Sequence, residues 1–189
     1  FVEDFETGGF PESWTSNGDG AWTVTEDASG FGTGVYSMRF DNYYYDAQGA
    51  RDRIWMGKRA GDNMGVSFDV AYAQYSDGYS DTLALVYSTD CGDTWTELWS
   101  LGGDDLSTAP DNTGYYVPSS TEWASYYGSF PSGEYFEDVI IAFENRGRYG
   151  NAIYLDNINV FTNFSVNELG NGAAQLSIYP NPASTQVRV

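Results

Sequence analysis

Short segments in which apolar and polar residues alternate with a period of two recur along this chain, and they constrain its fold more than any other feature. Clear examples are Val35 to Phe40, Gly65 to Tyr75 and Asp81 to Ser88. Turn-forming residues separate the segments about every 8–12 residues, and no segment has helical periodicity. The pattern predicts roughly nine or ten short strands. We therefore predict an all-β fold, an antiparallel β-sandwich of the jelly-roll type.

The composition changes after the last predicted strand. Residues 1–162 carry the strand pattern and form one predicted module. Residues 163–175 have the polar, glycine-containing composition of a linker. Residues 176–189 then begin a new segment.

The charge balance excludes several classes of partner. The 189 residues include 27 acidic side chains and 8 lysines and arginines, which gives a net charge of −19. Such a chain has little with which to neutralise phosphates, so neither nucleic acid nor an anionic lipid surface is a predicted partner. No apolar run is long enough to span a bilayer, and we predict no membrane insertion.

The sequence also lacks the usual residues of hydrolytic sites. It has no histidine and a single cysteine, Cys91, so it can form neither a Ser-His pair nor a His/Cys zinc cluster. Carboxylates are numerous but have no recognisable catalytic spacing. We predict that the chain is not an enzyme.

One predicted strand, Ile153 to Val160, contains a break in its alternation. The apolar phase shifts across Asp156-Asn157, which indicates a β-bulge and puts a carboxylate where an apolar residue is expected. A buried carboxylate is costly unless it is hydrogen-bonded, paired or bound to a metal. The acidic segment 3–6 near the start of the chain supplies similar groups. We predict that these two segments meet and close the sandwich, either through hydrogen bonds alone or around a cation.

The C-terminal residues carry a specific motif. Residues 176–189 include Tyr-Pro-Asn-Pro-Ala at positions 179–183. This segment resembles the opening of the C-terminal sorting domain of the type IX secretion system of Bacteroidetes. The resemblance implies a secreted or cell-surface protein that is exported by that system.

The body of the chain resembles the cleaved-adhesin or MAM-like jelly-roll modules of such secreted proteins. The matching pieces are Glu3 to Glu6 followed by Pro11 and Trp14, then Asp81 to Trp95, and Asn151 to Val160. Residues 41–53 look most like the version appended to pappalysin-like metalloproteases, although this chain lacks their His-Glu-x-x-His motif.

The same resemblance implies one structural calcium ion. In related jelly rolls a glutamate of the first strand, an aspartate of the last strand and carbonyls of a glycine-rich loop bind it. Here Glu6, Asp156 and the loop 29–35 match those parts, and Asp4 is a further candidate ligand. Mixed carboxylate and carbonyl oxygens suit Ca²⁺. The alternative is that Asp156 and Asn157 only cap an irregular strand.

Aromatic residues make up 17% of the chain, more than a core of this size requires, so we expect many rings to be partly exposed and predict a carbohydrate site. Sugar C–H faces stack on tyrosine and tryptophan rings, while polar groups orient the hydroxyls. The alternative is cross-strand packing of rings over a sheet face. The candidate ligand-binding residues are Tyr43, Tyr44, Tyr45, Tyr72, Tyr75, Tyr79, Trp123, Tyr126, Arg146 and Tyr149. Arg51, Asp52 and Arg53 predict an ion-paired strand end, with binding of anionic sugars as the alternative.

These observations predict a non-catalytic, calcium-stabilised accessory module of a larger secreted protein. Its partners would be a polysaccharide or cell-surface glycan and the catalytic domain of the same parent chain. Two alternatives remain open at this point: a protein-interaction or maturation domain of a secreted metalloprotease, and a structural spacer.

Overall fold

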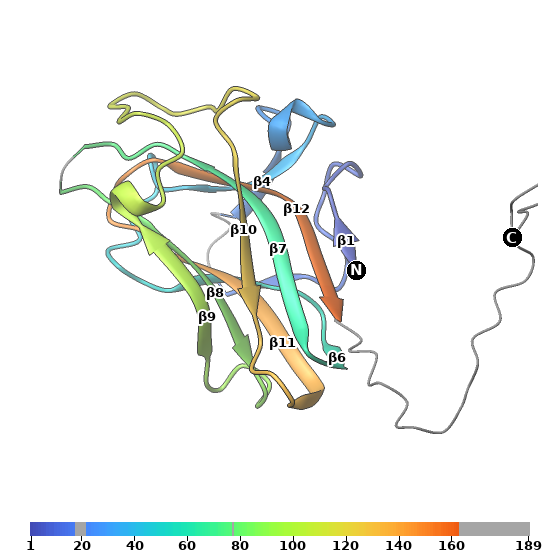
Figure 1. The fold of residues 1–189 in the computed structure, drawn as a ribbon. Helices are drawn as coiled ribbons and strands as arrows, with labels where there is room; N and C mark the ends of the chain where they lie inside the picture. Colours follow the sequence, from blue (N-terminus) through green and yellow to red (C-terminus); the bar gives the residue numbers. More distant parts are fainter. Residues whose placement is uncertain (18–21, 77, 163–189) are drawn as a thin grey trace, which may run out of the picture.

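Two antiparallel β-sheets pack face to face in the computed structural model, which describes residues 1–17, 22–76 and 78–162 (Figure 1). The predicted all-β sandwich is confirmed. The predicted linker 163–175 and sorting segment 176–189 lie outside the described residues. Within the described part, no helix is long and apolar enough to cross a membrane.

Each sheet has six strands. The first sheet runs in the order β10 (Ala124–Ser129), β7 (Met64–Tyr72), β12 (Ala152–Thr162), β4 (Ser37–Asp41), β3 (Trp22–Thr25), with β1 (Val2–Glu3) paired to β12. The second runs in the order β2 (Thr15–Ser16), β5 (Asp52–Trp55), β11 (Tyr135–Arg146), β8 (Thr82–Ser88), β9 (Thr96–Gly102), with β6 (Arg59–Asp62) paired to β11. Two short 3₁₀ turns, η1 (Gly30–Gly32) and η2 (Gly103–Asp105), lie in the connections.

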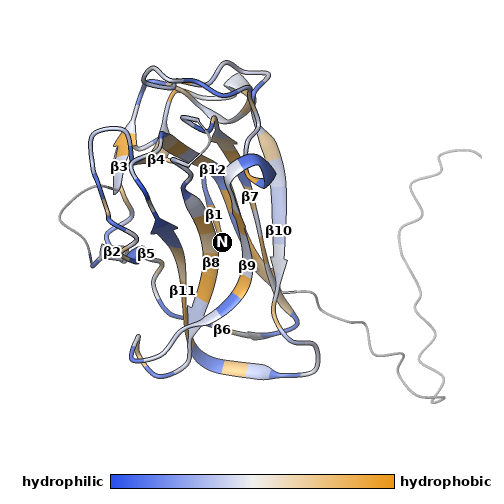
Figure 2. Ribbon diagram, turned by 90° about the vertical axis from the view of Figure 1, so that its left-hand side faces the viewer, coloured by the Kyte–Doolittle hydropathy of each residue, from blue (hydrophilic) through white to orange (hydrophobic). Residues whose placement is uncertain are grey.

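The core lies between the two sheets, where the alternating strands place their apolar side chains. Phe68 of β7 and Phe143 of β11 meet there edge to face, with ring centroids 4.9 Å apart, and both side chains are buried. The hydrophobic colour in Figure 2 lies mainly on the strands, whereas the connecting loops are largely hydrophilic. The side chains of the loops at the strand ends are therefore not needed for the core and can form a ligand-binding site.

The predicted meeting of the two ends of the module is confirmed. Val2 pairs with Asn159 and Glu3 with Ile158, so β1 extends the first sheet along β12. The predicted bulge is also present, because the register between β12 and β7 shifts between Asp156 and Asn159. Asn157 takes φ of +50° at this point.

The sequence predicts a strand only over the apolar stretch Val139 to Glu144, and this prediction was wrong in extent. β11 begins earlier, at Tyr135. The polar pair Glu137-Asp138 and the shift in the pairing with β6 between Phe136 and Val139 conceal its first residues. β2 and β6 were not predicted. Each is short, and the sequence of β6, Arg-Ala-Gly-Asp, has no apolar alternation to reveal it.

Candidate functional site

A pocket of about 420 Å³ opens among the loops that follow β4, β7 and β11. Because these strands end on the same side of the sandwich, residues distant in the sequence meet there. The pocket is lined by Tyr43, Tyr44, Tyr75, Tyr79, Tyr149 and Gly150. Its volume lies within the range of about 300–1,000 Å³ that is usual for small-ligand sites. The structure thus brings five of the ten predicted ligand-binding residues together.

The tyrosine rings form a continuous row. Tyr43 contacts Tyr44 edge to face at 4.9 Å between centroids and lies 6.2 Å from Tyr75, which contacts Tyr79 at 5.7 Å. Tyr115 stacks on Tyr44 at 5.6 Å and an interplanar angle of 27°. Tyr44 remains 75% exposed. The row therefore offers ring surface to a ligand while the rings hold one another in place.

The carboxylate of Asp81 holds the loop that carries Tyr149. Its Oδ1 accepts hydrogen bonds from the backbone N–H groups of Arg148 (2.9 Å) and Gly150 (3.3 Å), and its Oδ2 accepts one from Asn151 N–H (2.8 Å). A Cβ at position 150 would overlap Asp81 Oδ2, so glycine is required there. Tyr149 adopts φ of +61°, a left-handed conformation that this loop imposes.

Burial and hydrogen bonding oppose each other at Asp81. Burial raises the pKa of this carboxyl, and the hydrogen bonds from the loop N–H groups and the Tyr72 hydroxyl counteract part of the shift. Burial beside Asp81 also raises the pKa of Tyr72. Tyr72 therefore stays neutral and donates its hydroxyl proton to Asp81 Oδ2 at 3.1 Å.

The other predicted binding residues do not line this pocket. Tyr72 is fully buried and Trp123 is 6% exposed, so neither can contact a ligand; the prediction is wrong for both because their rings pack inside the fold. Tyr45 and Tyr126 are partly buried against the main core cluster. Arg146 lines a neighbouring cleft.

That cleft has a volume of about 270 Å³ and a different chemistry. It is lined by Gly49, Arg51, Ser80, Thr82, Arg146 and Arg148. The predicted ion-paired strand end is present beside it, but the partner is Glu144 of β11. Glu144 Oε1 accepts hydrogen bonds from Arg51 (2.8 Å) and Arg146 (2.6 Å), and Oε2 accepts one from Arg53 (2.6 Å).

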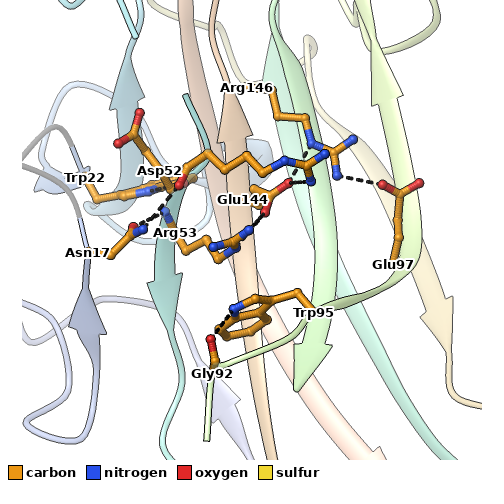
Figure 3. Close-up of polar contacts among 10 residues, drawn as sticks. Asn17, Trp22, Asp52, Arg53, Gly92, Trp95, Glu97, Glu144 and Arg146 are labelled. Atoms are coloured by element: carbon orange, nitrogen blue, oxygen red, sulfur yellow. Dashed lines mark hydrogen bonds and ion pairs between the residues drawn. The ribbon is translucent and has the colours of Figure 1, made fainter. Parts of the chain in front are cut away.

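Figure 3 shows how Glu144 lies among the arginines, with Arg146 reaching onward to Glu97. The Arg146 Nη2 to Glu97 Oε2 distance is 2.7 Å. Glu144 is fully buried, and a buried carboxylate needs such a shell of donors. The arginines thus stabilise the sandwich as well as lining a surface cleft.

Two of the three predicted acidic calcium ligands lie in the clasp, which we define as Glu6, Asp156 and the loop 28–36. Glu6 Oε1 accepts bonds from the N–H groups of Val35 (2.8 Å) and Tyr36 (3.0 Å). Asp156 Oδ2 accepts one from Gly30 N–H (2.6 Å). The two predicted calcium-binding side chains therefore both accept hydrogen bonds from the same glycine-rich loop.

Asp4 has a different role in this structure. It is exposed, and its Oδ1 accepts a bond from Glu6 N–H at 3.3 Å, which orders the first segment. Across the described residues, no group of three or more His, Cys, Asp or Glu side chains is placed to hold a metal. A cation at the clasp would therefore need backbone carbonyls among its ligands. Calcium binding stays a prediction.

The surroundings of Asp156 disfavour the ionised form of its carboxyl. Burial raises its pKa to about 6, the nearby charges of Glu6 and Asp69 add to the shift, and the Gly30 and Asn157 N–H groups oppose it. A cation next to Asp156 would favour its ionised form.

The sequence did not predict Tyr115 and Asp81 beside the tyrosine pocket, or Arg148 in the neighbouring cleft. Tyr115 lies in a long polar loop, and only the aromatic pair Tyr115-Tyr116 marks it there. Asp81 directly precedes β8 and resembles an ordinary turn residue. No sequence signal shows that its carboxylate oxygens accept hydrogen bonds from backbone N–H groups 67–70 residues away.

Comparison with known proteins supports the fold. No family model matches the sequence, and no curated protein was found to match it. Among solved structures, the chain is similar to the K1 cleaved adhesin domain of Lys-gingipain from Porphyromonas gingivalis W83. That similarity has a TM-score of 0.60 and 19% identity, and it covers 86% of this chain and 98% of the adhesin domain.

Two carbohydrate-binding modules are also similar. CBM27-1 of Caldicellulosiruptor saccharolyticus, solved with mannohexaose, has a TM-score of 0.56 and 19% identity over 86% of this chain and 96% of its own. The CBM22-1 xylan-binding domain of Paenibacillus barcinonensis Xyn10C has a TM-score of 0.54 and 14% identity over 85% and 91%. The fold is therefore a β-sandwich of the kind found in cleaved adhesin domains and carbohydrate-binding modules.

Replacing Asp81 by Asn should destabilise the protein although it changes one atom of the side chain. The amide NH₂ would face a loop N–H group, which would leave buried donors unpaired at a cost of about 2–4 kcal/mol in the free energy of unfolding. Urea denaturation measures this. The exposed Asp105→Asn variant is the control and should change stability by less than about 0.5 kcal/mol. Equal stability of Asp81→Asn and the wild type would contradict the assigned role.

The raised pKa of Asp156 predicts a pH dependence in metal-free buffer. Because the folded state binds this proton more tightly than the unfolded state, the contribution is complete below the unfolded pKa and is lost as pH rises through about 6. The free energy of unfolding should therefore fall by up to about 3 kcal/mol from pH 4 to pH 7 relative to an Asp156→Asn variant. Denaturation in EDTA across this range measures it. Parallel pH profiles of the two proteins would refute it.

Proposed function

We propose that this chain is a non-catalytic extracellular module that binds a carbohydrate through the tyrosine pocket. The observation that carries the proposal is the row of partly exposed rings around a cavity of about 420 Å³. Sugar rings present apolar C–H faces that stack on tyrosine, and the phenol hydroxyls can bond to sugar hydroxyls.

The similar proteins add support to this proposal. One is solved with mannohexaose, another is a xylan-binding domain, and a third is a cleaved adhesin domain. At 14–19% identity these likenesses concern the fold, so the ligand must be argued from this chain's own residues. The tyrosines of the pocket are those residues.

The setting of the module is part of the proposal. Residues 179–183, Tyr-Pro-Asn-Pro-Ala, support export by the type IX system to the cell surface or the medium. A glycan-binding module in that setting would attach its parent protein to a polysaccharide or a cell surface. The parent's catalytic domain would thereby be held near its substrate.

Calcium would bind at the clasp, where it would stabilise the fold and take no part in binding the carbohydrate. Glu6, Asp156 and carbonyls of the loop 29–35 would hold it, and the observation that favours a cation there is that both carboxylates bond to this one loop. The glycines at 30 and 34 fit this arrangement, because a Cβ at either position would crowd the side chains of Asp156 and Asn157 or of Glu6. The ion would reduce the electrostatic repulsion between the carboxylate of Asp156 and those of Glu6 and Asp69.

Alanine at Tyr44, Tyr79 or Tyr149 should weaken glycan binding. Each removes an exposed ring from the pocket, and loss of one stacking contact should lower the affinity about tenfold. A glycan array identifies a bound oligosaccharide, and isothermal titration calorimetry measures the variants with it. Tyr135→Ala is the matched control, since Tyr135 is 67% exposed but lies at the start of β11, outside the pocket. Binding that survives all three pocket substitutions would refute the pocket as the site.

Calcium should raise the melting temperature of the wild type. At a concentration about 100 times the dissociation constant, the gain is about 2.7 kcal/mol, or roughly 5–10 °C for a domain of this size. Differential scanning calorimetry in Ca²⁺ and in EDTA measures it. Asp156→Asn and Glu6→Gln should abolish the gain, whereas Asp105→Asn should keep it. The same midpoint in both buffers would rule out a calcium site.

A further inference from the structure

The cleft lined by arginines adjoins the tyrosine pocket. Arg148 lines the cleft and Tyr149 lines the pocket, and Ser80 and Tyr79 are divided between them in the same way. Each pair is consecutive in the chain, and consecutive Cα atoms are about 3.8 Å apart. The two cavities therefore lie next to each other along the same two chain segments.

The cleft concentrates positive charge in an acidic protein. It is lined by three of the chain's eight lysine and arginine side chains, although the chain carries 27 carboxylate side chains. Arg53 lies beside the cleft as a fourth arginine. The carboxylates that pair with these arginines are Glu144 and Glu97. Local positive charge of this kind acts at short range, since salt screens the rest of the protein beyond about 8 Å.

Arg148 differs from its neighbours in the cleft. Arg51 and Arg146 donate to Glu144, and Arg146 also pairs with Glu97. Among residues 1–17, 22–76 and 78–162, no carboxylate or other acceptor holds the Arg148 guanidinium. Its backbone is nevertheless fixed, because Arg148 N–H donates to Asp81 Oδ1. An exposed cation on an anchored backbone is well placed to receive an anionic ligand.

The chemistry of the lining fits an oxyanion. A guanidinium presents parallel N–H donors that match the two oxygens of a carboxylate or a sulfate. The hydroxyls of Ser80, just before β8, and of Thr82, the first residue of β8, add donors to the lining of the cleft. Neutral sugar hydroxyls would use this arrangement less fully, because they carry no charge for Arg148 to pair with.

We propose that the arginine cleft is a subsite for an anionic substituent, a carboxylate or a sulfate, on the polysaccharide whose sugar ring occupies the tyrosine pocket. This inference rests on the proposed function and narrows its substrate class to acidic polysaccharides. The tyrosine row supplies the stacking surface, and Arg148 supplies the selection for charge.

Matched ligand pairs test the inference. Oligogalacturonate is compared with its methyl ester, and dextran sulfate with dextran, by isothermal titration calorimetry in about 0.15 M NaCl. The wild type should bind one acidic member about tenfold more tightly than its neutral counterpart, and added salt should reduce that preference. Which pair shows the preference distinguishes a uronate from a sulfate ester.

The variants separate this inference from the proposed function. Arg148→Gln should remove most of the preference for the acidic ligand and leave neutral binding unchanged, and Arg148→Lys should keep part of it. Lys58→Gln, which removes an exposed cation paired with Asp138, is the control and should change nothing. Equal binding of acidic and neutral members, or an intact preference in Arg148→Gln, would overturn the subsite and leave the tyrosine pocket standing. Binding of no member at all would contradict both.

Discussion

The buried carboxylate of Asp81 is the contact on which the proposed binding surface depends. Its oxygens accept bonds from three backbone N–H groups of the loop between β11 and β12 and from the Tyr72 hydroxyl of β7. One side chain at the start of β8 therefore fixes the loop that places Tyr149 in the pocket and Arg148 in the cleft. A loop of small and polar residues has little apolar surface of its own, so this anchor supplies the order that packing cannot.

Two other carboxylates do comparable work elsewhere in the sandwich. Glu144 gathers Arg51, Arg53 and Arg146 on the outside of the second sheet, and Asp156 holds the loop 28–36 against the first. All three are buried, and each has its desolvation offset by N–H donors. At Asp81 and Asp156 the offset is incomplete, as the raised pKa of each carboxyl indicates. Asp81 and Glu144 hold residues beside the two cavities, whereas Asp156 lies in the clasp.

The sequence was sufficient for the sandwich because its strands alternate and its turns are frequent. It also located much of the pocket, since Tyr43, Tyr44 and Tyr149 lie in loops where rings are not needed for a core. Tyr72 was misassigned although it alternates in phase with Val66, Phe68 and Val70 of β7, and its ring is buried in the same core cluster as theirs. Asp81 was missed because its partners are backbone N–H groups of a distant loop. Almost every residue carries such a group, so the sequence does not indicate which of them will be partners.

We propose that the tyrosine pocket, and not the face of either sheet, receives the ligand. Nuclear magnetic resonance of the labelled protein, titrated with the best oligosaccharide from the array, tests this most directly. We expect the largest chemical-shift changes on the pocket loops, at residues 43–45, 75, 79 and 148–150. Changes confined to the strands β10, β7, β12 and β4, with these loops unaffected, would contradict it.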